Sequence, residues 1–315
     1  MVAPSVARPR SMPRFSGLAW RRARWGYVFI APWIIGFLVF TAIPMVATFV
    51  FTFTNINLAQ AEPLKFVGLR NYETLLNDKQ TWTSLGITFK FALLALPVAV
   101  ILPLLVALLL HSRHLVGSGA FRVLFFLPYV VPFVATVFIW QGMLNPETGW
   151  VNYALEAVGI SDPPGWLEDP GWVYPGLMLI GAWGIGAGII VYLAGLKGIP
   201  SDLYEAARID GAGPWQSLRH ITIPMLTPVI FYTIVLSVVE VLQYFLVPLV
   251  LQNGTGEPGG STMFYNLYLY KNFFTFQNMS YGATLAWLLF LISLVITLVL
   301  FGTARRWVYY AGEAR

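Results

Sequence analysis

Six long apolar stretches alternate with polar segments along the chain. We place them at Tyr27–Phe53, Leu85–Leu110, Val123–Leu144, Tyr174–Leu196, Leu226–Leu251 and Tyr281–Phe301. Each is long enough to cross about 30 Å of hydrocarbon as an α-helix. The third is the weakest because Pro128 and Pro132 interrupt it, although a helix bundle can satisfy the carbonyls that a proline leaves free. The pattern predicts an all-α polytopic membrane protein with six transmembrane helices.

Composition agrees with this class of protein. The chain has 315 residues, of which 57% are hydrophobic and only 10% are charged, with a mean hydropathy of +0.69. A soluble domain normally carries about 25% charged residues, so an ordinary globular core does not explain these values. The chain has no cysteine, which excludes disulfides and thiolate metal sites.

The positive residues gather on one side of the predicted spans. That side holds 14 of the 19 Lys and Arg residues, and these 14 are Arg8, Arg10, Arg14, Arg21, Arg22, Arg24, Arg113, Arg122, Lys197, Arg208, Arg219, Arg305, Arg306 and Arg315. Because cytoplasmic loops are enriched in Lys and Arg, both termini are predicted to be cytoplasmic. This topology signal accounts for the net charge of +5 without any binding of nucleic acid.

The N-terminus favours a retained first helix. A cleaved signal peptide would have an apolar region of only about 7–15 residues, and this one is nearly twice as long. Residues 1–26 are predicted to form an Arg-rich cytoplasmic tail that lies against anionic lipid. Residues 27–302 are predicted to form the membrane domain, with a polar coupling loop at 197–225, and residues 303–315 to form a second cytoplasmic tail.

The polar loop at 197–225 predicts a helix, a turn and a second helix. Ser201 is placed as the N-cap of the first helix, and Gly211 ends it. Pro214 suits the first turn of the second helix, which Pro224 is expected to break before the fifth span. On its own, this could be an ordinary interfacial helix with Glu205 paired to Arg208.

The full spacing of the loop is more specific. Glu205-Ala206-Ala207, then Gly211, then Ile221 to Pro224 resembles the motif of membrane subunits of bacterial ABC importers, with Ile223 where leucine is usual. Segments similar to the carbohydrate branch of this family are Phe66–Tyr72, Phe121–Pro128, Trp140–Pro146, Gly259–Thr262 and Leu269–Phe274. The resemblance covers most of residues 27–309 and is strongest to the first permease of a maltose- or glycerol-phosphate-type pair. It implies the type I ABC importer permease fold.

The resemblance also implies a mechanism and partners. Glu205, Ala206, Ala207 and Gly211 would form a coupling helix that docks on a separate, dimeric cytoplasmic ATPase, which would bind the ATP and Mg²⁺. A second homologous permease would complete the path, and an extracytoplasmic sugar-binding protein would deliver substrate. The location implied is the bacterial plasma (inner) membrane. In agreement, the chain contains no G-x-x-x-x-G-K-[ST] phosphate loop, so we expect no cofactor in this chain.

No catalytic or metal-binding constellation is evident. His111, His114 and His220 lie at predicted cytoplasmic edges and fit loop residues better than ligands. A polytopic membrane enzyme would need a catalytic cluster that the sequence lacks. A secondary transporter driven by an ion gradient is the alternative reading, but it would need more intramembrane acids than Glu240 and would leave the Glu-Ala-Ala loop unexplained.

Glu240 lies about midway along the fifth span, where a carboxylate is expensive unless it faces a cavity or a partner. Thr233, Ser237, Glu240, Gln243 and Tyr244 recur every three or four residues and predict one polar stripe on a helix. Contact of Glu240, Gln243 and Tyr244 with a polyhydroxylated substrate and contact with the second permease both remain open.

Trp183 in the fourth span is another candidate for the substrate path, since sugar faces stack on aromatic rings. It lies among Gly181, Gly184, Gly186 and Gly188, so tight helix packing is the alternative. The outer loops at 145–172 and 252–280 are predicted to meet the binding protein. The sequence does not identify the cargo, although the absence of intramembrane Arg or Lys near these candidates favours neutral sugars over phosphorylated ones.

Overall fold

The computed structural model describes residues 17–59, 63–112 and 115–309, and its chain divides into two compact units, Met1–Phe51 and Thr52–Arg315. The first unit contains α1 (Gly17–Phe37), a π-helical turn η1 (Leu38–Ala42) and α2 (Ile43–Phe51), which form a continuous apolar span from Ala23. Since α1 begins at Gly17, part of the predicted 1–26 tail is helical; residues 1–16 lie outside the described residues.

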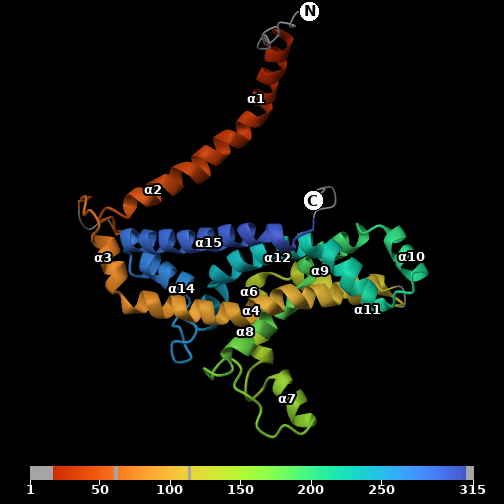
Figure 1. The fold of residues 1–315 in the computed structure, drawn as a ribbon. Helices are drawn as coiled ribbons and strands as arrows, with labels where there is room; N and C mark the ends of the chain where they lie inside the picture. The colour runs from red at the N-terminus through yellow and green to blue at the C-terminus, as the bar shows by residue number, and fades with distance from the viewer. Residues whose placement is uncertain (1–16, 60–62, 113–114, 310–315) are drawn as a thin grey trace, which may run out of the picture. The chain divides into compact units, whose positions relative to one another are not determined.

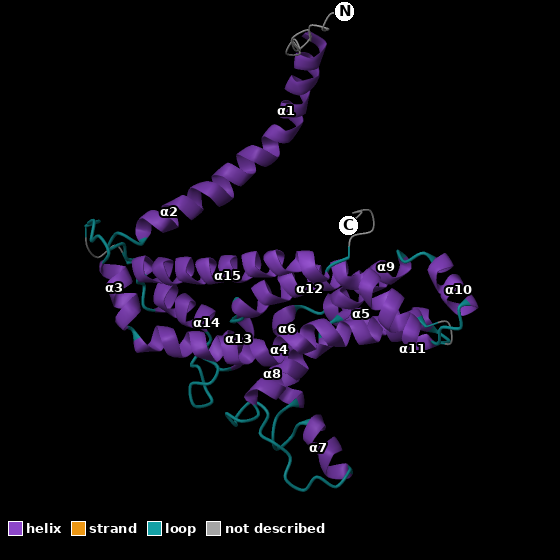
Figure 2. Cartoon of the chain, viewed as in Figure 1, coloured by secondary structure: helices purple, strands orange, loops and turns teal. Residues whose placement is uncertain are grey.

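The second unit is also helical, and its described residues carry only an isolated β-bridge between Thr54 and Phe66 (Figures 1 and 2). Its elements are α3 (Arg70–Asn77), α4 (Lys79–His111), α5 (Ser118–Val130), α6 (Phe133–Met143), α7 (Trp150–Ala157), α8 (Val173–Trp183), α9 (Gly186–Lys197), α10 (Ser201–Ile209), α11 (Pro214–Ser217), η2 (Leu218–Thr222), α12 (Ile223–Leu242), α13 (Leu246–Leu251), α14 (Tyr265–Tyr270), η3 (Lys271–Thr275) and α15 (Met279–Trp307).

The six predicted spans are all present as helices or helix pairs. The described residues hold four long apolar helices, at Ala23–Phe51, Lys79–His111, Pro214–Leu251 and Met279–Trp307. Two further spans are broken, because α5 and α6 meet at 102° and α8 and α9 at 56°. The prediction of an all-α fold with six spans is therefore confirmed when each bent pair is taken as one span.

Pro224 does not break the helix before the fifth span, so that part of the prediction was wrong. Helix α11 continues through η2 into α12, where the Ile223 amide donates to the Leu218 carbonyl five residues back. A regular α-helical turn would press the Pro224 ring against the carbonyl four residues earlier, and the wider π turn relieves that clash. The same arrangement precedes Pro44, where the Ile43 amide donates to the Leu38 carbonyl in η1.

Helix α4 is the central element of the second unit, and α9 and α12 pack along it. Close approach depends on glycine at two points of α9. A Cβ at Gly186 would lie 2.5 Å from the Phe125 carbonyl oxygen of α5, and one at Gly195 would lie 2.8 Å from a Val229 methyl of α12. The buried residues around this contact include Tyr192, Leu196 and Leu226. The two glycines, Gly186 and Gly195, therefore allow α9 to pack closely against α5 and α12.

Asp78 ties α4, α14 and α15 together at the end that we predict to be extracytoplasmic. Its carboxylate accepts from the hydroxyls of Tyr281 (2.6 Å), Tyr268 (2.7 Å) and Thr81 (2.7 Å) and caps α4 by accepting from the Gln80 amide (2.9 Å). Burial acts to raise the pKa of Asp78, but these hydrogen bonds together hold that pKa below its usual value of 3.8. Burial and the Asp78 carboxylate in turn raise the pKa of Tyr268 to about 12.

Candidate functional site

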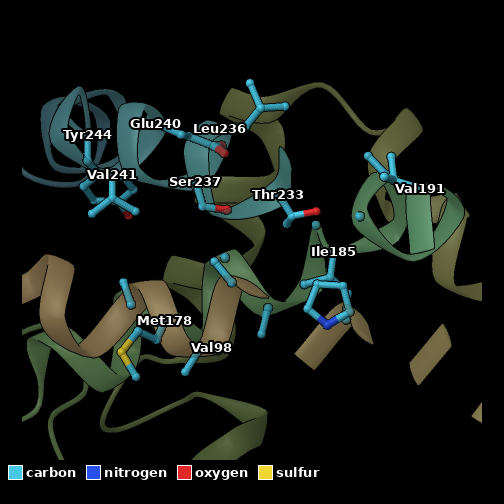
Figure 3. A pocket seen from close by; sticks show the side chains of 18 of the residues that line it. Val98, Met178, Ile185, Val191, Thr233, Leu236, Ser237, Glu240, Val241 and Tyr244 are labelled. Carbon is cyan, nitrogen blue, oxygen red and sulfur yellow. The ribbon is translucent and has the colours of Figure 1, made fainter. Parts of the chain in front are cut away.

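A cavity of about 540 Å³ lies between α4, α12 and the bend that joins α8 to α9 (Figure 3). The residues that line it are Phe91, Ala95, Val98, Ala99, Pro103, Tyr129, Leu177, Met178, Gly181, Ala182, Gly184, Ile185, Ala187, Gly188, Val191, Tyr232, Thr233, Leu236, Ser237, Glu240, Val241 and Tyr244. Most of its wall is apolar or aromatic. Its polar side chains come almost entirely from α12 and the residues that follow it.

The polar wall of the cavity is formed by Thr233, Ser237, Glu240 and Tyr244. Figure 3 shows Thr233, Ser237 and Glu240 along one helix, with Val98 and Met178 on the other side of the space. Spacing of four and three residues places Thr233, Ser237 and Glu240 on one face of α12, as the sequence predicts, while Tyr244 reaches the cavity from the turn that follows the helix. The predicted stripe thus meets a cavity over most of its length.

Gln243 leaves this face because α12 ends at Leu242 and α13 begins only at Leu246. Its backbone angles (φ −94°, ψ 12°) depart from the helix, its side chain is exposed, and its carbonyl accepts from the Asn266 side chain at 2.8 Å. The structure therefore brings Glu240 and Tyr244 to the cavity but not Gln243. The sequence analysis treats 226–251 as one unbroken helix, so it could not reveal this interruption.

Trp183 is at the end of α8 and does not line the cavity, although Ala182 and Gly184 on either side of it do. Its ring packs edge-on against Trp140 of α6, with 5.2 Å between the ring centroids. This is the packing role that the neighbouring glycines suggest. The aromatic residues that do reach the cavity are Phe91, Tyr129, Tyr232 and Tyr244, of which only Tyr244 is among our sequence candidates.

The bend between α8 and α9 forms part of the cavity wall through Gly184 and Ile185. Non-helical backbone at membrane depth is tolerated only where protein buries it or where it lines a space that water can enter. Gly188, one turn along α9, packs against the Pro103 ring of α4, where an added Cβ would lie 3.1 Å away. The break and the close packing together give this wall its shape.

An aromatic cluster joins the cavity to the outer loops. Phe91 and Tyr244 line the cavity, and their ring centroids are 5.0 Å apart. Phe264 packs against both rings, at 5.1 Å from Phe91 and 5.3 Å from Tyr244. Tyr174 contacts Phe91 at 5.5 Å, and its hydroxyl donates to the Ser261 carbonyl at 3.2 Å. The cluster therefore connects this end of the cavity to the loop that contains Ser261.

The two outer loops expected to meet a partner form one continuous surface. The Gln252 side chain donates to the Leu167 carbonyl at 3.2 Å, and Gly259 packs beside Pro170. Within the first loop, the Trp166 indole donates to buried Asn152 at 2.7 Å, which holds α7 in place. Trp150 and Tyr153 of α7 are exposed.

Helix α10 carries the Glu-Ala-Ala motif and has two different faces. Tyr204 and Ala207 are half-buried, and the Tyr204 hydroxyl is 2.9 Å from the Thr222 hydroxyl of η2. Glu205, Ala206 and Ile209 are exposed, and 87% of the Ile209 side chain is accessible. Arg208 donates to the Tyr204 carbonyl at 3.3 Å rather than pairing with Glu205. An apolar and acidic surface is thus presented outward.

Both ends of α10 have defined geometry. At the C-terminal end, the Gly211 amide donates to Arg208 at 3.1 Å and the Ala212 amide to Ala207 at 2.8 Å, which is a Schellman motif with Gly211 at φ +81°. At the N-terminal end, the prediction that Ser201 is the N-cap was wrong. Pro200 occupies that position, and Ser201 is the first helical residue.

Helix α10 lies beside the start of the helix that forms the polar wall of the cavity. In Figure 1, α10 and α11 lie together at one end of the second unit, away from α3 and α14. The helix from Pro214 runs continuously to Leu242 and carries Glu240 in its last turn. At 1.5 Å per residue, Glu240 lies about 40 Å from Pro214 along the axis. The Tyr204–Thr222 hydrogen bond attaches α10 directly to this helix.

Comparisons with known proteins agree with this architecture. Residues 85–309 match a family model described as the inner membrane component of binding-protein-dependent transport systems. A probable ABC transporter permease of Bacillus subtilis, YesP, is 37% identical over 91% of this chain and 93% of its own length. The lactose transport permease LacF of Rhizobium radiobacter is 35% identical over 89% of this chain and 94% of its own length.

Solved structures share the fold. A chain of a bacterial ABC transporter involved in import of the acidic polysaccharide alginate superposes with a TM-score of 0.78 and 26% identity, over 91% of this chain and 96% of that chain. A chain of a bacterial alginate ABC transporter in complex with its pentasaccharide-bound periplasmic protein has a TM-score of 0.77 and 25% identity over the same shares. The expected type I importer permease fold is confirmed.

Proposed function

The chain belongs to the family of inner membrane components of binding-protein-dependent transport systems, and from this premise we propose that it forms half of an ATP-driven path for a sugar. It is a transport subunit of the ABC permease class, not an enzyme. We further place it in the bacterial inner membrane with both termini cytoplasmic, paired with a second, homologous permease.

The observation that carries the proposal is the attachment of α10 to the cavity wall. The exposed Glu205, Ala206 and Ile209 form a surface that can be buried only against another molecule. The opposite face of α10 is fixed to η2 through Tyr204 and Thr222, and η2 continues into the wall that bears Glu240. Force applied to α10 is therefore transmitted to the side of the cavity.

We assign the exposed face of α10 to a dimeric cytoplasmic ATPase. Glu205 supplies a charge-assisted contact, Ala206 permits close approach, and Gly211 fixes the end of the helix, while Ala207 lies on the half-buried face behind them. ATP and Mg²⁺ bind to that partner. When the ATPase dimer closes, it draws this helix and its counterpart on the second permease together, and the path turns from inward-facing to outward-facing.

The sugar cargo is supported by the cavity and by the relatives. Tyr129, Tyr232, Tyr244 and Phe91 offer ring faces, while Thr233, Ser237 and Glu240 offer hydrogen-bonding groups. Flat rings combined with hydroxyl and carboxylate groups suit a ligand that is apolar on its ring faces and polar at its edge. LacF is a lactose permease and the structural neighbour belongs to an alginate importer. We assign Glu240 and Tyr244 to substrate contact.

The joined outer loops are the docking surface that we propose for the sugar-binding protein. The permease of the alginate transporter is seen in complex with a periplasmic protein. Here loops 145–172 and 252–280 are fixed to one another and present Trp150 and Tyr153, which are residue types that often anchor interfaces.

Uptake measured in vesicles with and without a co-expressed ATPase tests the proposal. We expect accumulation of labelled sugar only when the ATPase, ATP and the binding protein are all present. Uptake that continues without the ATPase and stops when the proton gradient is collapsed would instead establish an ion-driven transporter.

Docking at α10 is tested by co-purification of the ATPase with the permease. Glu205→Arg reverses the charge and adds bulk at a position where we expect a close, charge-assisted contact. The ATPase should therefore be lost from the complex, and uptake should fall by at least about tenfold. Glu73→Arg is the matched control, because Glu73 is also an exposed glutamate on a short helix but lies on the opposite side of the predicted membrane and outside the loops that we assign to docking. Equal ATPase recovery with both variants would exclude α10 as the docking site.

A further inference from the structure

Of the described residues that line the cavity, Glu240 alone has a charged side chain. The lining residues from α4, α5, α8 and α9 include no acidic or basic side chain, and those from α12 and the following turn contribute only Glu240. Helix α4 carries two lysines, Lys79 and Lys90, and neither lines the cavity. The Lys90 ammonium lies over the ring of Tyr174 at 5.5 Å, and Tyr174 does not line the cavity either. Across the part of the chain that the structure describes, the charge of the cavity is therefore that of one carboxylate.

Glu240 is also exposed and uncompensated. Among the residues that the structure describes, none forms a hydrogen bond or an ion pair with its carboxylate, although Ser237 lies one turn away and Thr233 two turns away on the same face. An isolated carboxylate at membrane depth is expensive unless it faces a cavity that water enters. Its exposure to the cavity meets that condition.

A single charge in a space with apolar walls acts on every solute that enters. The low-dielectric walls focus its field into the space instead of letting bulk water screen it. An acidic sugar would be repelled, a neutral sugar could donate hydroxyls to the carboxylate, and an amino sugar would be attracted. The fold alone does not set this preference, since the structural neighbour belongs to an importer of an acidic polysaccharide.

We propose that Glu240 makes this half of the path a charge filter, which admits neutral and amino saccharides and rejects acidic ones. The proposal rests on the sugar-transport function above and specifies the class of cargo. It assigns Glu240 to selection of the substrate rather than to contact with the second permease.

Sugar binding to the purified permease–ATPase complex in nanodiscs, without the binding protein, tests the filter. The probes are three β-1,4-linked trisaccharides, of glucose, of glucosamine and of glucuronic acid, which differ in charge but share their linkage. We expect the glucuronic acid trimer to bind at least about tenfold more weakly than the glucose trimer, and the glucosamine trimer to bind most tightly.

Variants at Glu240 separate the carboxylate from the shape of the cavity. In Glu240→Gln the three dissociation constants should converge to within about threefold, and in Glu240→Lys the acidic trimer should bind more tightly than the amino trimer. Glu73→Gln is the matched control, since this exposed glutamate lies on α3, outside the cavity and outside both outer loops that we assign to docking, and it should keep the wild-type order. Thermal unfolding of each complex checks that the variants fold.

Two results would overturn the filter. The first is wild-type binding of the acidic trimer as tight as that of the neutral trimer, and the second is discrimination that persists unchanged in Glu240→Gln. Uptake by the wild-type complex with its own binding protein is measured in parallel. If ATP-driven uptake occurs and the filter fails, only the assignment of Glu240 is lost; if uptake itself requires no ATPase, the proposed function fails as well.

Discussion

Asp78 shows how one side chain outside the apolar spans can fix the ends of three helices. Its carboxylate receives three hydroxyl hydrogen bonds, and two of them come from tyrosines about 190 and 200 residues away in the chain. From the sequence it is simply one of several acids in the outer loops. Its role depends on the packing of α14 and α15 against α4, which no local pattern in 70–80 reveals.

We predict that Asp78→Asn lowers stability in a way that depends on pH. The pKa of Asp78 is below its usual value in the folded protein, so the carboxylate adds stability above about pH 4 and this is lost as pH falls through the lowered pKa. Asparagine still caps α4 but cannot give charge-assisted hydrogen bonds to the tyrosines. Thermal unfolding in detergent should show a lower midpoint for the variant at pH 6 and a smaller difference at pH 3.

The matched control for this series is Asp162→Asn, which changes an exposed aspartate of the first outer loop. Its unfolding midpoint should stay within about 1 °C of the wild type at both pH values. A constant gap between Asp78→Asn and wild type from pH 6 to pH 3 would mean that the charge of Asp78 adds nothing to stability.

Gly211 is the second residue whose substitution has a defined consequence. An L-residue at φ +81° loses about 1 kcal/mol or more relative to glycine, and no neighbouring atom obstructs a Cβ at this position. Gly211→Ala should therefore loosen the end of α10 and lower the affinity of the ATPase by about fivefold, measured by titration of the purified partner. Gly213→Ala is the control in the same loop, since Gly213 has φ −74° and should tolerate alanine.

At the scale of the helices, the sequence predicted the spans well but not their interruptions. The apolar stretches gave all six positions to within a few residues at most ends, because length and hydropathy alone define a membrane helix. The 56° bend at Gly184 and the break after Leu242 were missed, since both are set by packing around the cavity. Pro224 was predicted to end a helix, whereas the π turns before Pro44 and Pro224 let both helices continue.

The contact between α9 and α5 gives a prediction about one of these elements. Gly186→Ala would place a methyl group 2.5 Å from the Phe125 carbonyl oxygen, so the helices must separate, and we expect a loss of stability of about 1–3 kcal/mol. Gly181→Ala on α8 is the control, because no atom lies within 4 Å of its added Cβ. Thermal unfolding of the two variants should differ by several degrees, and equal midpoints would show that the α5–α9 contact yields easily.

For the whole molecule, the predicted topology can be tested directly because the chain has no native cysteine. A cysteine introduced at Glu156 on α7 should react with a membrane-impermeant maleimide in intact cells. One introduced at Arg208 on α10 should react only after the membrane is permeabilised. Labelling of both positions in intact cells, or of Arg208 alone, would contradict the orientation inferred from the Lys and Arg residues.

Only part of the candidate site could be predicted from the sequence, because the site is formed by several helices that meet only in the folded molecule. The polar stripe on α12 follows from the period of a single helix, so Glu240 and Tyr244 could be found. The opposite wall comes from α4, α5, α8 and α9, and Phe91 and Tyr129 carry no local signal that they face the same space. Which side chains share a cavity is decided by how helices cross, not by the sequence of any one of them.

The unbroken helix from Pro214 to Glu240 is, in mechanical terms, a lever, and its Pro214 end lies beside the α10 surface that we assign to the ATPase. With an arm of about 40 Å, a tilt of only about 5° displaces the far end by about 3.5 Å, roughly the width of a side chain. Such a displacement is enough to move Glu240 across a hydrogen-bonding distance. In the proposed mechanism, a small rotation imposed on α10 by the ATPase is therefore enough to release a bound sugar without any rearrangement inside the helix itself.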